Sequence, residues 1–301
     1  MAVSGGVDSS VVAGLCARAL GPERVLALML PERDSSPDSL SLGALVARHF
    51  RIPAVTQDVT PILEAAGCYR LQEEAVKSLF PEYTSDWKFK VTLPSVLQSD
   101  RLSISRLTVQ SPDGETRSAR MPASVYLQLI AATNFKQRVR TMMEYYHGDR
   151  LNYAVVGTPN RLEFDQGFFV KGGDGLADIK PIAHLYKSQV YALARVLGVP
   201  AEICERVPTT DTFPLEQTQE EFFFGVPHEV LDHCLFGLNH GYAPAEVAPA
   251  VGLTAEQVER LYRDIEAKRR ATAALHMPEM LIAPVPEILG ARLPEEDRET
   301  E

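Results

Sequence analysis

The sequence lacks the features that mark several common classes of protein. Its cysteines form no CxxC pair and are not spaced with histidines as metal ligands, which favours reduced, mostly buried thiols. No apolar run reaches the roughly 18 residues of a membrane helix, and no signal peptide is recognisable. We therefore expect a soluble, cytoplasmic protein without a membrane partner. The cysteines concerned are Cys16, Cys68, Cys204 and Cys234.

Positive charge is also scarce. The chain has 30 lysines and arginines against 40 aspartates and glutamates, a formal net charge of -10. Such a protein repels nucleic-acid phosphates, so nucleic acid is not an expected partner. A small anionic substrate would need a local positive site. With 301 residues, 45% of them hydrophobic, the chain is long enough for a large core, and we expect a single domain over residues 1–301.

Short apolar segments alternate with helical patterns along the first half of the chain. This alternation predicts an α/β fold, a doubly wound and mainly parallel sheet with helices on both faces. The first strand is unusually short, so either the sequence starts late or a neighbouring chain covers the stub. Strands are expected at 2–3, 24–30, 54–59 and 153–157, and helices at 9–20, 39–50, 61–79, 123–146, 186–197, 227–238, 243–251 and 254–275.

Two segments depart from this rhythm. Residues 80–121 contain Pro112-Asp113-Gly114, a typical hairpin turn, and predict an inserted flap or protruding hairpin. Residues 293–301 are acidic and are expected to form a frayed tail. The C-terminal third is expected to be helical.

A glycine-rich loop lies between the first strand and the first helix. Glycines let backbone N–H groups approach an anion, and a helix N-terminus adds unpaired donors. Asp8 would repel a bare phosphate, so it suggests Mg²⁺ bridging carboxylate and phosphates. The alternative is that this loop is an ordinary turn between a strand and a helix and binds no ligand. The candidate phosphate-binding residues of the loop are Ser4, Gly5, Gly6, Val7, Asp8, Ser9 and Ser10.

The loop resembles the PP-loop of N-type ATP pyrophosphatases, and a second stretch narrows the resemblance. Residues 134–187 are similar to NAD synthetases, with N-x-K-x-R, V-x-G-T-x-N-x-x-E, K-x-G-D-G-x-x-D-I-x-P and L-x-K in the same order. The resemblance covers most of the chain. It implies a ligase that forms a C–N bond: ATP adenylates the nicotinate carboxylate of deamido-NAD, and ammonia then displaces AMP. It also implies Mg²⁺ and a homodimer with sites near its interface.

The resemblance implies roles for individual residues. Asp8, Lys187 and Thr209 would be the catalytic group, and Asp8 and Glu163 the magnesium ligands. Outside the loop, ATP would be bound by Thr158, Lys187 and Thr209, and deamido-NAD by Arg138, Lys171, Asp178 and Lys268.

Several of these residues also have an interpretation that involves no ligand. Arg138 and Lys268 could be solvated charges, and Glu163 and Lys171 could form a surface ion pair. Asp178 could fix a turn, and Thr209 could belong to a plain polar loop. The histidines suggest no metal site, and residues 222–224, all phenylalanine, would pack a helix start or a dimer seam.

Some positions depart from the family pattern. Ala267 stands where many members have histidine, Val170 replaces a threonine, and residues 210–219 differ from the common loop. Two alternatives therefore stay open: another PP-loop enzyme that amidates a different carboxylate, or a non-catalytic nucleotide-binding homologue. The loop at residue 4 leaves no room for an N-terminal glutaminase domain, so free ammonia is the simplest donor, with a separate glutaminase subunit as the alternative.

Overall fold

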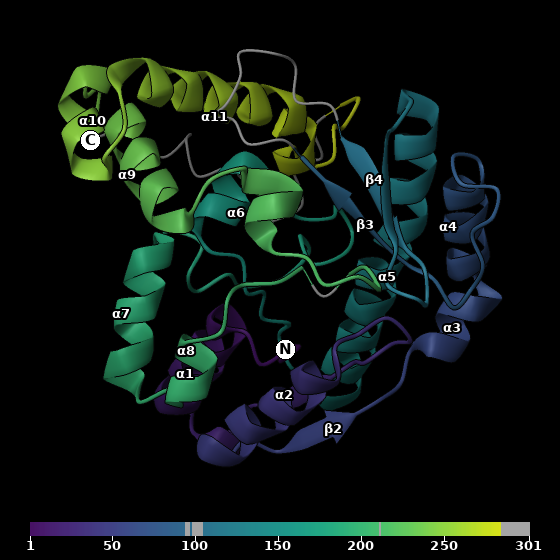
Figure 1. Ribbon diagram of the computed structural model, residues 1–301. Coiled ribbons are helices and arrows are strands. Elements are labelled where there is room, and N and C mark those ends of the chain that lie inside the picture. Colours follow the sequence, from purple (N-terminus) through teal and green to yellow (C-terminus); the bar gives the residue numbers. More distant parts are fainter. Residues whose placement is uncertain (94–96, 98–104, 211, 284–301) are drawn as a thin grey trace.

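The computed structural model describes residues 1–93, 97, 105–210 and 212–283 (Figure 1). The predicted tail at 293–301 and part of the predicted insertion lie outside these residues. The helices are α1 (Val7–Leu20), α2 (Pro37–His49), α3 (Thr60–Ala65), α4 (Cys68–Lys77), α5 (Ala123–Leu151), α6 (Arg161–Gln166), α7 (Lys187–Leu197), α8 (Ala201–Cys204), α9 (His228–Asn239), α10 (Pro244–Val251) and α11 (Ala255–His276). The strands are β1 (Ala27–Met29), β2 (Ala54–Thr56), β3 (Lys88–Thr92), β4 (Arg106–Gln110) and β5 (Thr116–Arg120), and a short 3₁₀ turn η1 (Pro22–Arg24) and a π turn η2 (Glu220–Phe224) complete the set.

A short parallel sheet forms the centre of the N-terminal part. β1 pairs in parallel with β2, and Ala2 forms a parallel bridge to Leu28 on the other side of β1. The strand expected at 153–157 is reduced to one parallel bridge between Val156 and Ile179. The reason is local: the backbone N–H of Val155 donates to the side chain of Asp178, so it is not available to a sheet ladder.

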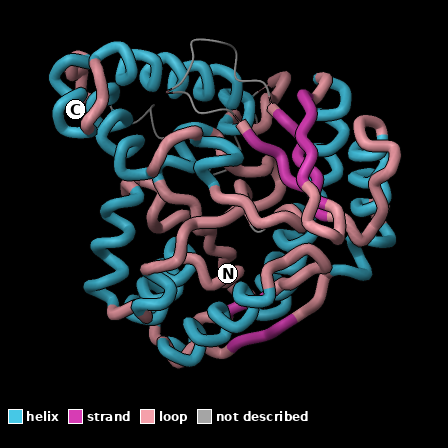
Figure 2. The backbone as a smooth tube through the Cα atoms, viewed as in Figure 1, coloured by secondary structure: helices cyan, strands magenta, loops and turns pink. Residues whose placement is uncertain are grey.

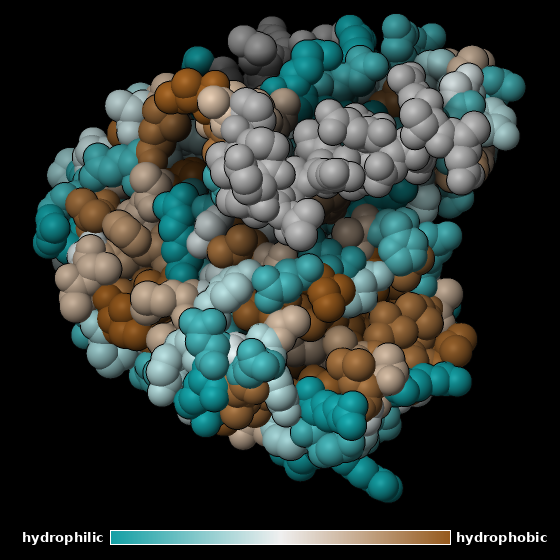
Figure 3. Space-filling view, turned by 180° about the vertical axis from the view of Figure 1, so that it is seen from behind, coloured by the Kyte–Doolittle hydropathy of each residue, from teal (hydrophilic) through white to brown (hydrophobic). Residues whose placement is uncertain are grey.

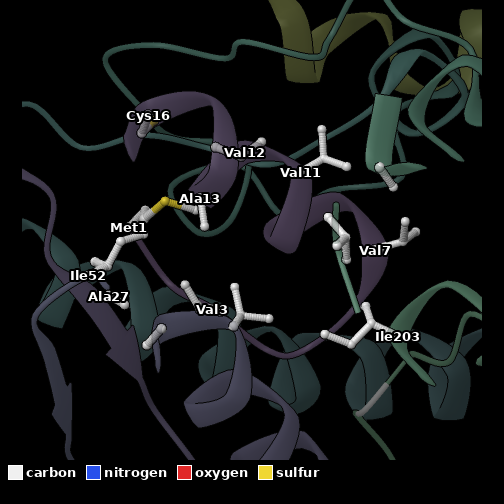
Figure 4. Packing of buried hydrophobic residues seen from close by; sticks show 14 of the residues in the cluster. Met1, Val3, Val7, Val11, Val12, Ala13, Cys16, Ala27, Ile52 and Ile203 are labelled. Atoms are coloured by element: carbon white, nitrogen blue, oxygen red, sulfur yellow. The ribbon is translucent and has the colours of Figure 1, made fainter. Parts of the chain in front are cut away.

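Helices cover both faces of this sheet because successive strand residues point to opposite sides. Ala27 packs in one cluster with side chains from α1, α2 and α7, and Ala13 of α1 lies beside the side chain of Met1 (Figure 4). Leu28 packs into a second cluster with side chains from α3, α4 and α5. Fully burying one such leucine stabilises the fold by about 1.5–3 kcal/mol. The predicted doubly wound α/β fold is confirmed.

The helix expected at 61–79 is two helices. Gly67 has a φ of +76°, a left-handed conformation that ends α3 and precedes α4. Glycine adopts this conformation without steric cost. Both helices contact α5, and α4 lies along it (Figure 1).

The insertion forms a three-stranded antiparallel sheet in the order β3-β4-β5. The predicted turn at Gly114 joins β4 to β5, with a φ of +88°. One face of the sheet is apolar and packs against α4 and α5, because Phe89, Val91, Leu107 and Val109 join Leu129 in a buried cluster. The insertion is therefore held against the body of the molecule along its apolar face.

The C-terminal third is helical, as expected. α9, α10 and α11 pack around a buried apolar cluster that includes Leu231, Leu235 and Leu261. Thr254 caps α11 through a capping box with Gln257, which matches the expected start of that helix. Within the described residues, no helix has the length and apolar character needed to cross a membrane.

Candidate functional site

A cavity of about 600 Å³ opens at the carboxyl ends of the parallel strands, where α/β folds commonly bind ligands. Its walls come from the glycine-rich loop, α5 and the segments around residues 156–171 and 206–212. Loops occupy this central region near the N-terminus (Figure 2). The predicted site residues that line it are Ser4, Gly6, Val7, Asp8, Ser9, Arg138, Thr158, Glu163, Lys171, Lys187 and Thr209.

The glycine-rich loop has a backbone that only glycine fits. Gly5 has a φ of +76°, and a Cβ there would lie 2.3 Å from the Cβ of Leu42. α1 starts at Val7 without a side-chain cap, so its first amides are left for a ligand or water. Ser9 and Ser10 are buried, and their hydroxyls donate to the carbonyl of Gly6 at 3.1 and 2.8 Å. In this structure these hydroxyls hold the loop rather than face outward.

Asp8 is the meeting point of three elements. Its carboxylate accepts a hydrogen bond from the ammonium of Lys187 at the start of α7. The other carboxylate oxygen accepts from the side-chain amide of Asn160, at 3.0 Å. Asn160 is 1% exposed and precedes α6, the short helix that carries Glu163. The loop, α6 and α7 are thereby tied together around one carboxylate.

Asn160 also fixes Glu163. The Asn160 side-chain oxygen accepts from the backbone N–H groups of Leu162 and Glu163, and the Glu163 carboxylate accepts from the Asn160 N–H at 3.0 Å. This capping box orients the first turn of α6. The second oxygen of Glu163 accepts from the side chain of Gln219 at 3.0 Å. Glu163 and Asp8 thus share Asn160 as a common partner.

The charges in this group affect one another. Burial in the site, together with repulsion from Asp8, raises the pKa of Glu163 to about 7. Burial disfavours the charged form of Lys187, but the Asp8 and Glu163 carboxylates outweigh it and raise the pKa of that ammonium. Lys187 is 2% exposed, and Asp232 anchors it by accepting from its backbone N–H at 3.1 Å. A buried cation is thereby held beside two carboxylates.

This donor set suits a hard divalent cation. Asp8 and Glu163 offer carboxylate oxygens, the ligand type that Mg²⁺ prefers, beside a loop shaped for phosphates. Among the described residues no group of three or more His, Cys, Asp or Glu side chains gathers into a metal site. A magnesium ion held by this pair would therefore complete its coordination with phosphate oxygens and water, as it commonly does in nucleotide sites.

Two predicted dinucleotide-binding residues, Lys171 and Arg138, also line the cavity. The ammonium of Lys171 donates to the carbonyls of Ala274 and Met277 at the end of α11, at 3.0 and 3.2 Å. Arg138 on α5 donates to the carbonyl of Lys171 at 3.3 Å. Since Lys171 is engaged by α11, the alternative of an ion pair with Glu163 is wrong.

The other two predicted dinucleotide-binding residues lie outside the cavity lining. Asp178 accepts from the N–H of Val155 at 2.7 Å and from the hydroxyl of Tyr145 at 3.2 Å. Both partners are distant in sequence, so Asp178 links its segment to α5 and to Val155 rather than capping a local turn. Lys268 pairs with Asp264 at 2.7 Å, and its side chain is only 15% exposed. The alternative of a solvated charge is therefore wrong for Lys268.

The sequence reasoning assigned no role to several residues of the cavity. Arg140, Glu144 and Asp174 also line the cavity. Burial raises the pKa of Glu144. Asn160 is part of the V-x-G-T-x-N-x-x-E pattern, but the sequence reasoning assigned it no role. The sequence alone does not show that the amide of Asn160 reaches Asp8.

Comparisons with known proteins agree with the family resemblance of the sequence. Residues 1–82 and 97–272 match the family model described as NAD synthase. A protein of Mesorhizobium japonicum named NH(3)-dependent NAD(+) synthetase is 56% identical over 279 residues, which is 93% of this chain and 88% of that protein. Two solved structures share the fold at 22% identity: an NMN synthetase from Francisella tularensis, with a TM-score of 0.59 over 94% of this chain and 87% of that one, and an NH3-dependent NAD synthetase from Campylobacter jejuni, with a TM-score of 0.56 over 93% and 87%.

Proposed function

The chain belongs to the NAD synthase family, and we propose that it uses ATP to amidate deamido-NAD to NAD, with ammonia as the nucleophile. The observation that carries the proposal is the convergence of Asp8, Glu163 and Lys187 beside the glycine-rich loop. This group matches what an adenylating enzyme needs: a phosphate cradle, carboxylates for a metal and a cation for the leaving group.

The glycine-rich loop binds the outer phosphates of ATP. The free amides at the start of α1 and the ammonium of Lys187 offset their negative charge. Thr158 and Thr209 line the same cavity and bind the nucleotide from the opposite side. A Mg²⁺ ion held by Asp8 and Glu163 would neutralise the phosphates and orient the α-phosphate for in-line attack.

The chemistry proceeds in two steps. A carboxylate oxygen of the nicotinate ring attacks the α-phosphorus, the bond to pyrophosphate breaks, and a carboxyl-adenylate forms. Ammonia then attacks the carboxyl carbon, and AMP leaves with the bonding electron pair. The amide nitrogen loses a proton in this step.

Arg138 and Lys171 bind the dinucleotide in the cavity. Lys171 would exchange the α11 carbonyls for a phosphate, a stronger partner because that hydrogen bond is between two charges. Asp178 supports this binding indirectly through Val155 and Tyr145. A direct contact of Lys268 with deamido-NAD would require it to leave Asp264.

A second candidate function is amidation of a related carboxylate. It is favoured by Ala267, where the resemblance implies a histidine, and by the engagement of Lys268 with Asp264 outside the cavity. The two candidates share the ATP chemistry and differ only in the acceptor. They are separated by comparing deamido-NAD with the nicotinate mononucleotide that lacks its adenylate half.

We further propose a homodimer. The solvent-facing side of α5 carries large apolar side chains, and Leu127, Met142 and Tyr146 are 65%, 51% and 54% exposed. Leu176 and Ile179, in the segment after α6, are also exposed. The rear of the molecule has apolar side chains gathered in patches (Figure 3), and such patches are typical of protein interfaces.

We also propose that the protein acts in the cytoplasm. Thiols stay reduced in that compartment, which suits the free cysteines.

The test is a complete reaction with ATP, Mg²⁺, an ammonium salt and deamido-NAD. The expected products are NAD, AMP and pyrophosphate in equal amounts, and replacing ammonium with glutamine alone should stop NAD formation. Stimulation by glutamine only when cell extract is added would point to a separate glutaminase. ATP cleavage to ADP and phosphate, or no turnover of deamido-NAD, would overturn the proposal.

A further inference from the structure

The free edge of the inserted sheet, along β3, is lined by residues that pair in turn with the residues around Thr209. We call residues 207–210 and 212–221 together the Thr209 segment. The N–H of Leu215 donates to the carbonyl of Phe89 on β3 at 3.2 Å, and the N–H of Leu93 donates to the carbonyl of Glu221 at 2.9 Å. Between them, the buried side-chain amide of Gln217 donates to the carbonyl of Val91. The outer edge of β3 is thus lined by the second half of this segment.

The pairing continues from there to Thr209. Thr209 and Thr218 form an antiparallel bridge. The N–H of Thr210 donates to the carbonyl of Gln217 at 3.0 Å, and the N–H of Gln219 donates to the carbonyl of Pro208 at 3.1 Å. A continuous set of hydrogen bonds therefore runs from β3, through residues 215–221, to the residues on either side of Thr209.

Side chains reinforce this connection. Phe213 is 4% exposed and packs edge-on against Phe89 of β3, with ring centroids 5.7 Å apart. The ammonium of Lys90 donates to the carbonyl of Glu216 at 3.3 Å and pairs with the Glu221 carboxylate at 3.1 Å. These contacts hold the segment to the sheet by packing and by charge.

A buried lysine attaches the same segment to α5. Lys136 is fully buried, and its ammonium donates to the carbonyl of Thr212 at 2.9 Å. It also pairs with Glu32 at 3.0 Å and Asp34 at 2.6 Å, in the segment that follows β1. The segment bearing Thr209 is therefore fixed on both sides, by the inserted sheet and by α5.

We propose that the inserted sheet is a positioning element that holds the Thr209 segment at the nucleotide cavity before any substrate binds. The inference rests on the proposed function, since it assigns the sheet to the ATP side of that site. It also accounts for a part of the chain that the family model does not match, because residues 83–96 include the whole of β3. Ordering the segment in advance removes an entropic cost from ATP binding.

The test uses variants at the contact between β3 and the segment. Lys90→Ala removes the contacts to Glu216 and Glu221, and Lys90→Arg restores a cation there. Arg117→Ala on β5 is the matched control, because Arg117 contacts Glu82 and Glu115 rather than the segment. Amide hydrogen exchange is measured on the ligand-free proteins, so this readout does not depend on which carboxylate is amidated.

In the wild type, the amides of Thr210, Leu215 and Gln219 should be protected. Lys90→Ala should accelerate their exchange about threefold, raise the KM for ATP by a similar factor, and change kcat much less. Lys90→Arg should restore most of the protection, and Arg117→Ala should leave the segment as in the wild type. Unprotected amides in the wild type, or equal effects of Lys90→Ala and Arg117→Ala, would overturn the inference. Protection with no NAD formed would refute the proposed function alone.

Discussion

Asn160 offers the sharpest test of how the metal ligands are held. Its amide donates to Asp8, while its oxygen caps the helix that bears Glu163. The substitutions Asn160→Ser and Asn160→Ala separate these two tasks. Serine keeps an oxygen that caps a helix, but it is too short to reach Asp8. Alanine loses both contacts.

The expected magnitudes follow from the two contacts. A hydrogen bond to a charged group contributes about 1.5–3 kcal/mol, and loss of a partner that orients a metal ligand typically lowers metal affinity about 10–100-fold. We therefore expect both variants to bind Mg²⁺ and nucleotide about 10–100-fold more weakly. Only Asn160→Ala should also lose the cap, worth about 1 kcal/mol of unfolding free energy.

Calorimetric titration of Mg²⁺ with a non-hydrolysable ATP analogue measures the affinity, and urea unfolding measures the stability of the same samples. Both variants lose the bond to Asp8, so the difference between them isolates the cap. If Asn160→Ser bound the metal–nucleotide complex as tightly as the wild type, the amide of Asn160 would have no part in positioning Asp8, and the reasoning would be refuted.

Other predictions address the same group. Lys187→Met should weaken ATP binding by more than about tenfold, because a charge-assisted contact to the phosphates is lost; calorimetry with unchanged affinity would contradict this. In metal-free protein the pKa of Glu163, about 7, lies above its ordinary 4.5, so the folded state holds the extra proton and stability should fall as pH rises from about 4.5 to 7. Urea unfolding at a series of pH values should show a smaller decline in the free energy of unfolding for Glu163→Gln than for the wild type. The same pH dependence in both proteins would contradict this prediction. Arg269 donates two hydrogen bonds, of 2.6 and 2.7 Å, to Asp165 on α6. Arg269→Lys should therefore lower the free energy of unfolding by about 1 kcal/mol and weaken Mg²⁺ binding. An unchanged affinity for Mg²⁺ would contradict this prediction.

The sequence predicted those parts of the fold that depend on local pattern. Apolar runs and turn residues were sufficient for α1, α2 and α11, and the cap at Thr254 was read correctly. The break at Gly67 was missed because the apolar pattern continues across it, while the glycine conformation depends on how α3 and α4 pack. The strand at 153–157 was too long because Asp178 takes its hydrogen bond.

The candidate site was predicted as a set of residues but not as an arrangement. The pairing of Asp8 with Lys187 joins residues 179 positions apart, which no local pattern reveals. The attachment of residues 215–221 to β3 is likewise non-local and involves neither motif. Asp178 and Lys268 were assigned by resemblance, and their contacts here with Val155, Tyr145 and Asp264 come from packing that resemblance does not describe.

The central claim is that Asp8, Glu163 and Lys187 serve one metal-bound triphosphate. A crystal structure with Mn²⁺ and an ATP analogue that cannot be cleaved between the α- and β-phosphates tests it directly, since anomalous scattering locates the metal. The account predicts one Mn²⁺ ligated by Asp8 and Glu163, with the outer phosphates on the amides of the glycine-rich loop and Lys187 in contact with them. A metal that touches neither carboxylate, or a triphosphate outside this loop, would contradict it.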